Sequence, residues 1–163
     1  MERNDRFLTR DRMRFTRNTT SSTLAYVSIL FNVFYYVYLY NFDVGNYYYT
    51  AITGFSIVYN LLFLLFAFLS SEGVKNYSNR FALVLIGLGA MQIVRIFYIP
   101  LNAYRATITL AGETVRVMTD GQFITIVVFL VASAIAAISA GIVGILKTGM
   151  LRSHERRLAK ENK

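Results

Sequence analysis

The chain has 163 residues, of which 55% are hydrophobic, 15% aromatic and 16% charged, and its formal net charge is +8 at pH 7. This composition is too apolar for a soluble domain and indicates a membrane protein. Because the sequence contains no cysteine, it excludes disulfides, thiolate metal sites and iron–sulfur clusters.

Four apolar windows are long enough to cross a bilayer, which takes about 20 helical residues. They lie at about 24–42, 48–69, 81–99 and 122–147. The windows predict an all-α integral membrane protein, a four-transmembrane-helix bundle within residues 24–147. We expect a basic cytoplasmic segment before it, 1–23, and a basic cytoplasmic tail after it, 148–163.

The basic residues are distributed unevenly between the two ends of these spans. Six precede the first span, two separate the second and third, and six lie at or after the end of the fourth, whereas the predicted outside loop, 101–121, holds only Arg105 and Arg116. Since Lys and Arg near spans stay in the cytoplasm, both termini are predicted to be cytoplasmic. Without a cleavable signal at its start, the chain fits a multi-pass protein of the bacterial cytoplasmic membrane.

The N-terminal segment carries arginines three and four residues apart, which would share one face of a helix. These are Arg3, Arg6, Arg10, Arg14 and Arg17. Such a helix predicts contact with anionic lipid headgroups at the cytoplasmic face. A simple positive-inside anchor accounts for the same residues equally well, and docking to an acidic partner is a third interpretation. Nucleic acid is not expected, because no binding motif frames these residues.

Polar and aromatic residues interrupt the first two spans. Seven tyrosines gather between residues 35 and 49, where an aromatic belt is the favoured interpretation and a vestibule for an amphiphile is the alternative. Asn32 and Asn60 each place an amide in hydrocarbon, where it needs an interhelical partner. We expect both to be structural hydrogen bonds rather than ligand contacts.

A single arginine interrupts the third span in the stretch GAMQIVRIFYIP. Arg95 lies five residues before Pro100, with Gln92 one turn away on the same face. Three interpretations compete: a side chain that snorkels to the outer interface, a structural ion pair with Asp43, and an anion or headgroup site built with Gln92 and nearby tyrosines. The first two together are favoured, because intramembrane arginines are usually satisfied by local partners or water.

The predicted outside loop alternates apolar and polar residues in RATITL and TVRVM, which predicts a small β-hairpin with Gly112 in its turn. A two-stranded hairpin is marginal alone in water, so we expect it to rest on the helices or on a partner. Thr119 or Asp120 is predicted to cap the fourth span.

Small residues recur at every fourth position of the fourth span, in two adjacent rows. The rows are Ala132, Ala136, Ala140 and Gly144, and Ser133, Ala137 and Gly141. They predict close helix packing. Packing within the bundle is favoured, and the width of the surface leaves room for a second copy or another subunit. A short basic helix is predicted after Lys147.

The spans contain no Asp or Glu, and the single histidine, His154, lies in the charged tail. We therefore expect no mid-membrane carboxylate site, no haem, no metal and no catalytic constellation. The predicted function is a non-catalytic accessory or scaffold subunit of a larger membrane complex, without a cofactor. It would contact other subunits or its own copies through the small-residue face, the outside hairpin and the basic ends.

Two other classes of function compete with a subunit role. A small oligomeric channel or transporter for an anionic or amphipathic solute, using Arg95 and Gln92, is the alternative. A membrane enzyme acting on lipid is the least favoured, because Ser, Thr, Tyr and Arg alone form no recognisable set of nucleophile, base and orienting group.

Overall fold

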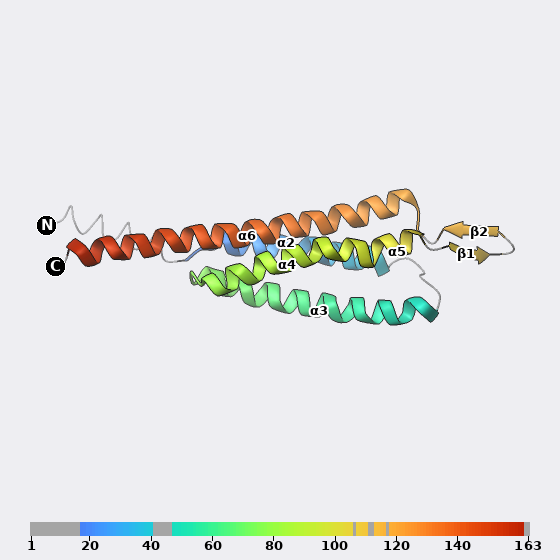
Figure 1. Ribbon diagram of the computed structural model, residues 1–163, viewed down its shortest axis with the longest axis horizontal. Coiled ribbons are helices and arrows are strands. Elements are labelled where there is room, and N and C mark those ends of the chain that lie inside the picture. Colours follow the sequence, from blue (N-terminus) through green and yellow to red (C-terminus); the bar gives the residue numbers. More distant parts are fainter. Residues whose placement is uncertain (1–16, 41–46, 106, 111–112, 117, 162–163) are drawn as a thin grey trace.

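The computed structural model describes residues 17–40, 47–105, 107–110, 113–116 and 118–161. Four long helices run nearly parallel to one axis, and a short helix and a pair of strands lie at one end (Figure 1). The elements are α2 (Thr19–Tyr40), α3 (Tyr47–Lys75), α4 (Asn79–Tyr98), α5 (Pro100–Arg105), β1 (Thr107–Leu110), β2 (Glu113–Arg116) and α6 (Asp120–Glu161).

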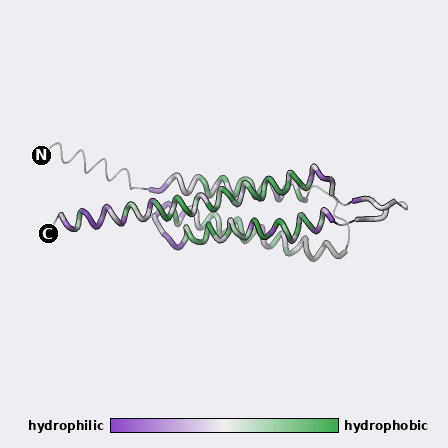
Figure 2. The backbone as a smooth tube through the Cα atoms, turned by 45° about the horizontal axis from the view of Figure 1, so that its top comes forward, coloured by the Kyte–Doolittle hydropathy of each residue, from purple (hydrophilic) through white to green (hydrophobic). Residues whose placement is uncertain are grey.

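The four long helices confirm the predicted spans. Each is long and apolar enough to cross a membrane, which indicates a multi-pass membrane protein. Apolar residues dominate the middle of the bundle, and hydrophilic residues gather toward its ends (Figure 2).

The helices extend beyond the apolar windows. α2 begins at Thr19, where the side-chain Oδ1 of Asn18 accepts a hydrogen bond of 3.3 Å from the backbone N–H of Ser21. Because Asn18 caps the helix here, α2 begins before the apolar window. Its first turn is rich in hydroxyl groups, so the hydropathy of the sequence does not reveal it. At the other end of the chain, α6 continues without a break to Glu161. The basic helix predicted after Lys147 is therefore confirmed, and it is the last part of α6.

The bundle places α3 and α6 at opposite corners. α6 packs against α2 and α4, α3 packs against the same two helices, and α3 and α6 contact each other little. α4 therefore packs against two helices on different faces, with one face toward α6 and another toward α3.

The α4–α6 interface is close because glycines on each helix accommodate the backbone of the other. A Cβ added at Gly89 would lie 2.9 Å from the carbonyl oxygen of Ala134, and one at Gly141 would lie 2.6 Å from that of Ala82. Such distances leave no room for a side chain on either glycine. The two backbones are held together by their smallest residues, as in other membrane helix pairs.

The small-residue rows of α6 are used inside the bundle. Ala136, Ala140, Gly144, Ser133, Ala137 and Gly141 are buried, and Ala132 is half-buried. Both α2 and α4 cover these rows: the Ser21 hydroxyl of α2 donates to the carbonyl of Ala140, while Ala82 of α4 lies beside Gly144. The prediction that this face leaves room for a second copy or another subunit is wrong, because two helices of the same chain already cover the face.

The turn between α3 and α4 is a Schellman motif. The backbone N–H of Ser78 donates to the carbonyl of Gly73, and that of Tyr77 donates to the carbonyl of Val74. Tyr77 takes the left-handed position with φ of 58°, which glycine usually occupies. The chain thereby reverses within three residues, so α3 and α4 are antiparallel neighbours.

The strands β1 and β2 pair antiparallel, with Thr107 opposite Arg116 and Leu110 opposite Glu113. Gly112, the predicted turn residue, lies outside the described residues. The strands stand beyond the helix ends (Figure 1).

Thr119 caps the N-terminus of α6, as predicted. The Thr119 N–H donates to Gln122 Oε1 at 2.8 Å, and the Thr119 Oγ1 accepts from the backbone N–H of Gln122 at 3.4 Å. This reciprocal pair is a capping box. It fixes the direction in which α6 enters the bundle.

Candidate functional site

The candidate site begins on α4, whose buried residues form one stripe. They are Ala82, Leu85, Gly89, Gln92 and Arg95. Their spacing of three and four residues puts Arg95 on the inward face, and its exposed fraction is only 4%. The interpretation that Arg95 snorkels to the outer interface is therefore wrong.

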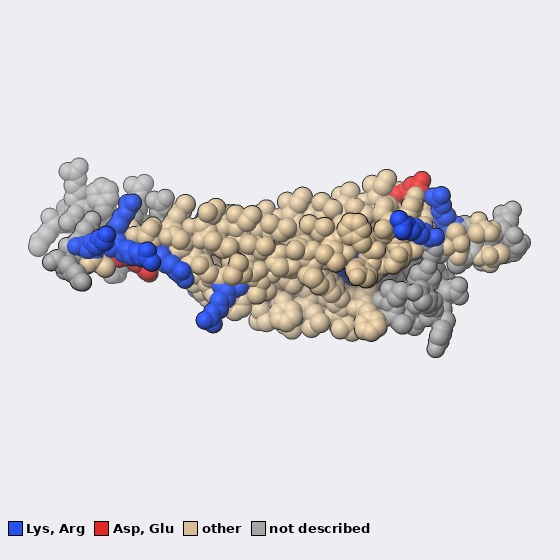
Figure 3. Space-filling view, in the orientation of Figure 1, with Lys and Arg blue, Asp and Glu red and all other residues tan. Residues whose placement is uncertain are grey.

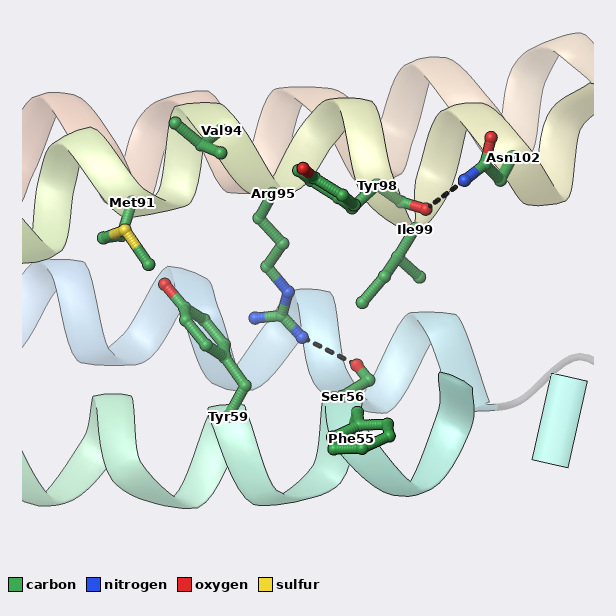
Figure 4. A pocket seen from close by; sticks show the side chains of 9 residues that line it. All are labelled: Phe55, Ser56, Tyr59, Met91, Val94, Arg95, Tyr98, Ile99 and Asn102. Atoms are coloured by element: carbon green, nitrogen blue, oxygen red, sulfur yellow. Dashed lines mark hydrogen bonds between the residues drawn. The ribbon is translucent and has the colours of Figure 1, made fainter. Parts of the chain in front are cut away.

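The guanidinium of Arg95 reaches across to α3. Its Nη1 donates to the Oδ1 of Asn60 at 2.8 Å, and its Nη2 donates to the hydroxyl of Ser56 at 2.9 Å. Ser56 and Asn60 are four residues apart, so they present both acceptors on one face of α3. The bond to Ser56 is drawn in Figure 4. The planar fork of the guanidinium suits this pair of acceptors.

Two tyrosine rings lie against the same guanidinium. Its central carbon is 4.3 Å from the ring centroid of Tyr35 on α2 and 4.7 Å from that of Tyr59 on α3. Both distances are within the range of cation–π attraction, which is strongest where water is excluded. Arg95 thus joins α4 to α2 and α3 through neutral groups.

One turn away, Gln92 ties α4 to α2 and α6. Its Nε2 donates to Asn32 Oδ1 at 2.8 Å and lies 3.5 Å from the hydroxyl of Ser133. Ser133 and Ser28 exchange bonds, because each hydroxyl donates to the backbone carbonyl of the other residue, at 2.9 and 2.8 Å. Polar groups of all four long helices therefore meet at one level, which we call the polar layer. Its members are Ser28, Asn32, Tyr35, Ser56, Tyr59, Asn60, Gln92, Arg95 and Ser133.

A pocket lies beside the polar layer, between α3 and α4, with a volume of about 580 Å³. Figure 4 shows Arg95 crossing it from α4 toward Ser56 and Tyr59 on α3. The other lining residues are Phe55, Met91, Val94, Tyr98, Ile99 and Asn102. The pocket therefore combines apolar walls with a few polar groups, a composition that is usual in sites for small molecules.

The structure brings together some of the predicted site residues. Arg95 and Gln92 both belong to the polar layer, and Asn32 and Asn60 make interhelical hydrogen bonds, as predicted. Asp43 lies outside the described residues, so its ion pair with Arg95 stays a prediction.

The N-terminal arginines are mostly outside the described part of the chain, which includes only Arg17, an exposed residue. Arg105 and Arg116, which flank the strand pair, are also exposed, and Nη1 of Arg116 lies 3.3 Å from the Asp120 carboxylate.

Sequence reasoning missed the contribution of α3 to this site. Ser56 and Tyr59 were not singled out, although Ser56 and Asn60 form a polar pair at helical spacing within an apolar span. Such a pair signals a helix face that meets a polar partner. Tyr35 was assigned to an interfacial belt, whereas it is fully buried against Arg95.

No family model, curated protein or solved structure matches this chain.

Proposed function

We propose that this chain is a non-catalytic subunit of a larger membrane complex, anchored by its four-helix bundle and docked to a partner through the basic end of α6. The observation that carries this proposal is the length of α6. At 1.5 Å per residue, its 42 residues extend for about 63 Å, about twice the thickness of the hydrocarbon core. The helix continues well past the other three at the end of the bundle where α2 begins (Figure 1).

The projecting end of α6 is exposed and basic. Its cations Arg152, Arg156 and Lys160 are four residues apart and share one face, with Arg157 beside them. Lys and Arg gather at this end in Figure 3. Like charges at this spacing destabilise an isolated helix, so acidic side chains of a partner would stabilise it by electrostatic complementarity.

A protein partner fits this surface better than lipid headgroups do. Lys160 lies thirteen residues beyond Lys147, which corresponds to about 20 Å of helix. Electrostatic attraction to a charged surface is screened over about 8 to 10 Å at physiological ionic strength. Headgroups would therefore attract the first turn of the projection, whereas its tip needs another partner.

The charge distribution supports an orientation with both ends of the chain in the cytoplasm. Lys75, the last residue of α3, and Arg80, in the first turn of α4, lie at the same end as the basic part of α6. Cytoplasmic retention of positive charge would place this end inside, and we assign the chain to the bacterial cytoplasmic membrane. The N-terminal arginines would then contact anionic headgroups, and the β1–β2 hairpin would offer a second contact surface outside.

The test is native mass measurement after mild-detergent extraction from the source membrane. We expect a defined complex with a stoichiometric, unrelated chain. Reversing the four charges (Arg152→Glu, Arg156→Glu, Arg157→Glu and Lys160→Glu) should abolish that complex, and the matched set Arg152→Lys, Arg156→Lys and Arg157→Lys should preserve it. Both variants should keep the helical circular dichroism of the parent protein.

Other masses would contradict the subunit role. A stable homo-oligomer would favour the small channel or transporter, because four helices enclose little space alone. A monomer without any partner would contradict both functions.

A further inference from the structure

The pocket between α3 and α4 opens sideways. Phe55 on α3 is 79% exposed, and Met91 and Tyr98 on α4 are 51% and 69% exposed, although all three line the pocket. Exposed apolar side chains on a membrane-spanning bundle face lipid tails, which are as apolar as leucine. The mouth of the pocket is therefore open to the hydrocarbon of the bilayer.

The pocket forms because α3 and α4 are spaced differently along their length. Near the turn that joins them, a Cβ added at Gly73 would collide with the ring of Phe81, so the helices are in close contact there. Farther along, the long side chain of Arg95 spans the distance from α4 to Ser56 and Asn60 on α3. This bridge keeps the helices apart, and the buried Arg95 and Ser56 form the inner wall of the pocket.

The described lining of the pocket is about as long as one leaflet is thick. On α4 and α5 it runs from Met91 to Asn102, which at 1.5 Å per residue corresponds to about 16 Å. One leaflet contributes about half of the hydrocarbon core, about 15 Å. The candidate span that contains these residues runs from Asn79 to Arg105, so Met91 lies near its middle. The pocket therefore extends from one interface to about the centre of the membrane.

Polar and apolar groups follow each other along the mouth of the pocket in the order in which they occur in a lipid. Asn102 lies at the α5 end and is exposed, and its Nδ2 donates to the carbonyl of Tyr98. Figure 4 shows these two residues at one end of the pocket and Met91 at the other. Val94 and Met91 make the lining apolar toward the centre. An ester group fits beside the exposed amide, and an acyl chain fits beside Val94 and Met91.

We propose that this pocket holds one acyl chain of a lipid from the leaflet on the α5 side, with the ester group near Asn102 and the end of the chain beside Met91. The volume of about 580 Å³ is typical of sites for small molecules. Arg95 acts only as part of the wall, through its bonds to Asn60 and Ser56, and its charge takes no part in binding. A transmembrane helix of a partner fits less well, because it crosses both leaflets whereas the lining spans one. The site does not depend on the docking role of α6.

The length of the site is tested with the full chain, which is delipidated in mild detergent and incubated with phosphatidylcholines that carry lauroyl or palmitoyl chains. Native mass spectrometry counts the bound lipid, and we expect one molecule per chain. Met91→Trp shortens the pocket and should weaken binding of the palmitoyl lipid at least tenfold more than binding of the lauroyl lipid. Ile93→Trp adds the same ring at a position that is 44% exposed and does not line the pocket, so it should change this ratio less than twofold. Equal effects of the two variants would overturn the proposal.

The direction of the chain is tested by photo-crosslinking with phosphatidylcholines that carry a diazirine either next to the ester or at the end of the acyl chain. We expect the first probe to label residues 98–102 and the second to label residues 91–94, and Met91→Trp should reduce labelling by the second probe at least fivefold. The reverse pattern, or equal labelling by both probes along α4, would overturn the proposal. So would a stable dimer of the chain that retains no lipid, because a second copy would then occupy the pocket.

Discussion

The two faces of α4 are built by different chemistry. Toward α6, Gly89 and its neighbours let the backbones approach so closely that an added Cβ would collide with a carbonyl oxygen. Toward α3, the contact runs through the long side chain of Arg95 to Ser56 and Asn60, and a pocket remains beside it. One face is closed by small residues and the other is bridged by polar ones.

The difference separates structure from candidate function. Small residues bring helices together through van der Waals contact and need no ligand. A buried guanidinium is expensive in hydrocarbon and needs several neutral or anionic groups around it. The α3 face therefore holds the candidate site, and the α6 face forms the support that fixes its position.

The largest expected effect comes from filling the closed face. Gly141→Leu should lower the free energy of unfolding by at least about 3 kcal/mol, because the side chain cannot fit beside Ala82 and Ile86 without moving a helix. Unfolding in mixed micelles, followed by circular dichroism, measures this. Gly87→Ala is the control on α4, since a Cβ there has no atom within 4 Å. It should be neutral or stabilising by up to about 1 kcal/mol, and equal effects of the two variants would contradict the close packing.

Removing Arg95, which connects α4 to α3, should lower the free energy of unfolding by a smaller amount. Arg95→Met should lower the free energy of unfolding by about 1 to 3 kcal/mol, because Ser56 and Asn60 lose their donor while buried. Adding Ser56→Ala and Asn60→Leu to this variant should recover at least half of the loss, since the unsatisfied groups are then removed. The same unfolding measurement applies, and simple additivity of the three substitutions would show that the residues do not act together.

The hydroxyl pair between α2 and α6 should contribute less again. Ser133→Ala is expected to cost about 0.6 kcal/mol, the average for an interhelical hydrogen bond in a membrane protein. A double-mutant cycle with Ser28→Ala should show positive coupling, because the two hydroxyls share their bonds. Ser153→Ala, at an exposed position on α6, is the control and should have no measurable effect on unfolding.

The smallest effect is expected outside the bundle. Deleting residues 150–163 should change the free energy of unfolding by less than about 0.5 kcal/mol, the usual range for exposed positions. The projecting end of α6 from Arg152 onward is largely exposed, so few bundle contacts are lost. A large loss of stability on deletion would show that this end supports the bundle rather than a partner.

Much of the fold followed from hydropathy and residue size. The four spans were predicted from apolar length, and the packing role of Ala136, Ala140 and Gly141 from their spacing. The need for partners at Asn32 and Asn60 followed from the cost of an unsatisfied amide in hydrocarbon. Each of these predictions uses only the residues of a single helix, and it can therefore be made from the sequence alone.

The partners of Arg95 did not follow in the same way. Its position in the span favoured snorkelling or an ion pair, whereas the structure turns it inward to Ser56, Asn60 and two tyrosine rings. The continuity of α6 through Lys147 did not follow either, because a change from apolar to basic composition does not show whether the same helix continues. Composition marks where a helix leaves the membrane, and backbone hydrogen bonding decides where it ends.

By itself, the sequence determined that four apolar helices form, that α6 carries the small residues, and that the charges gather at the ends. Only the tertiary structure decided which faces meet, and thereby that Arg95 is buried beside a pocket and that the small rows of α6 are already covered by α2 and α4. The physical reason is that hydropathy and size are properties of each residue, whereas a bond between two helices depends on their relative rotation and register.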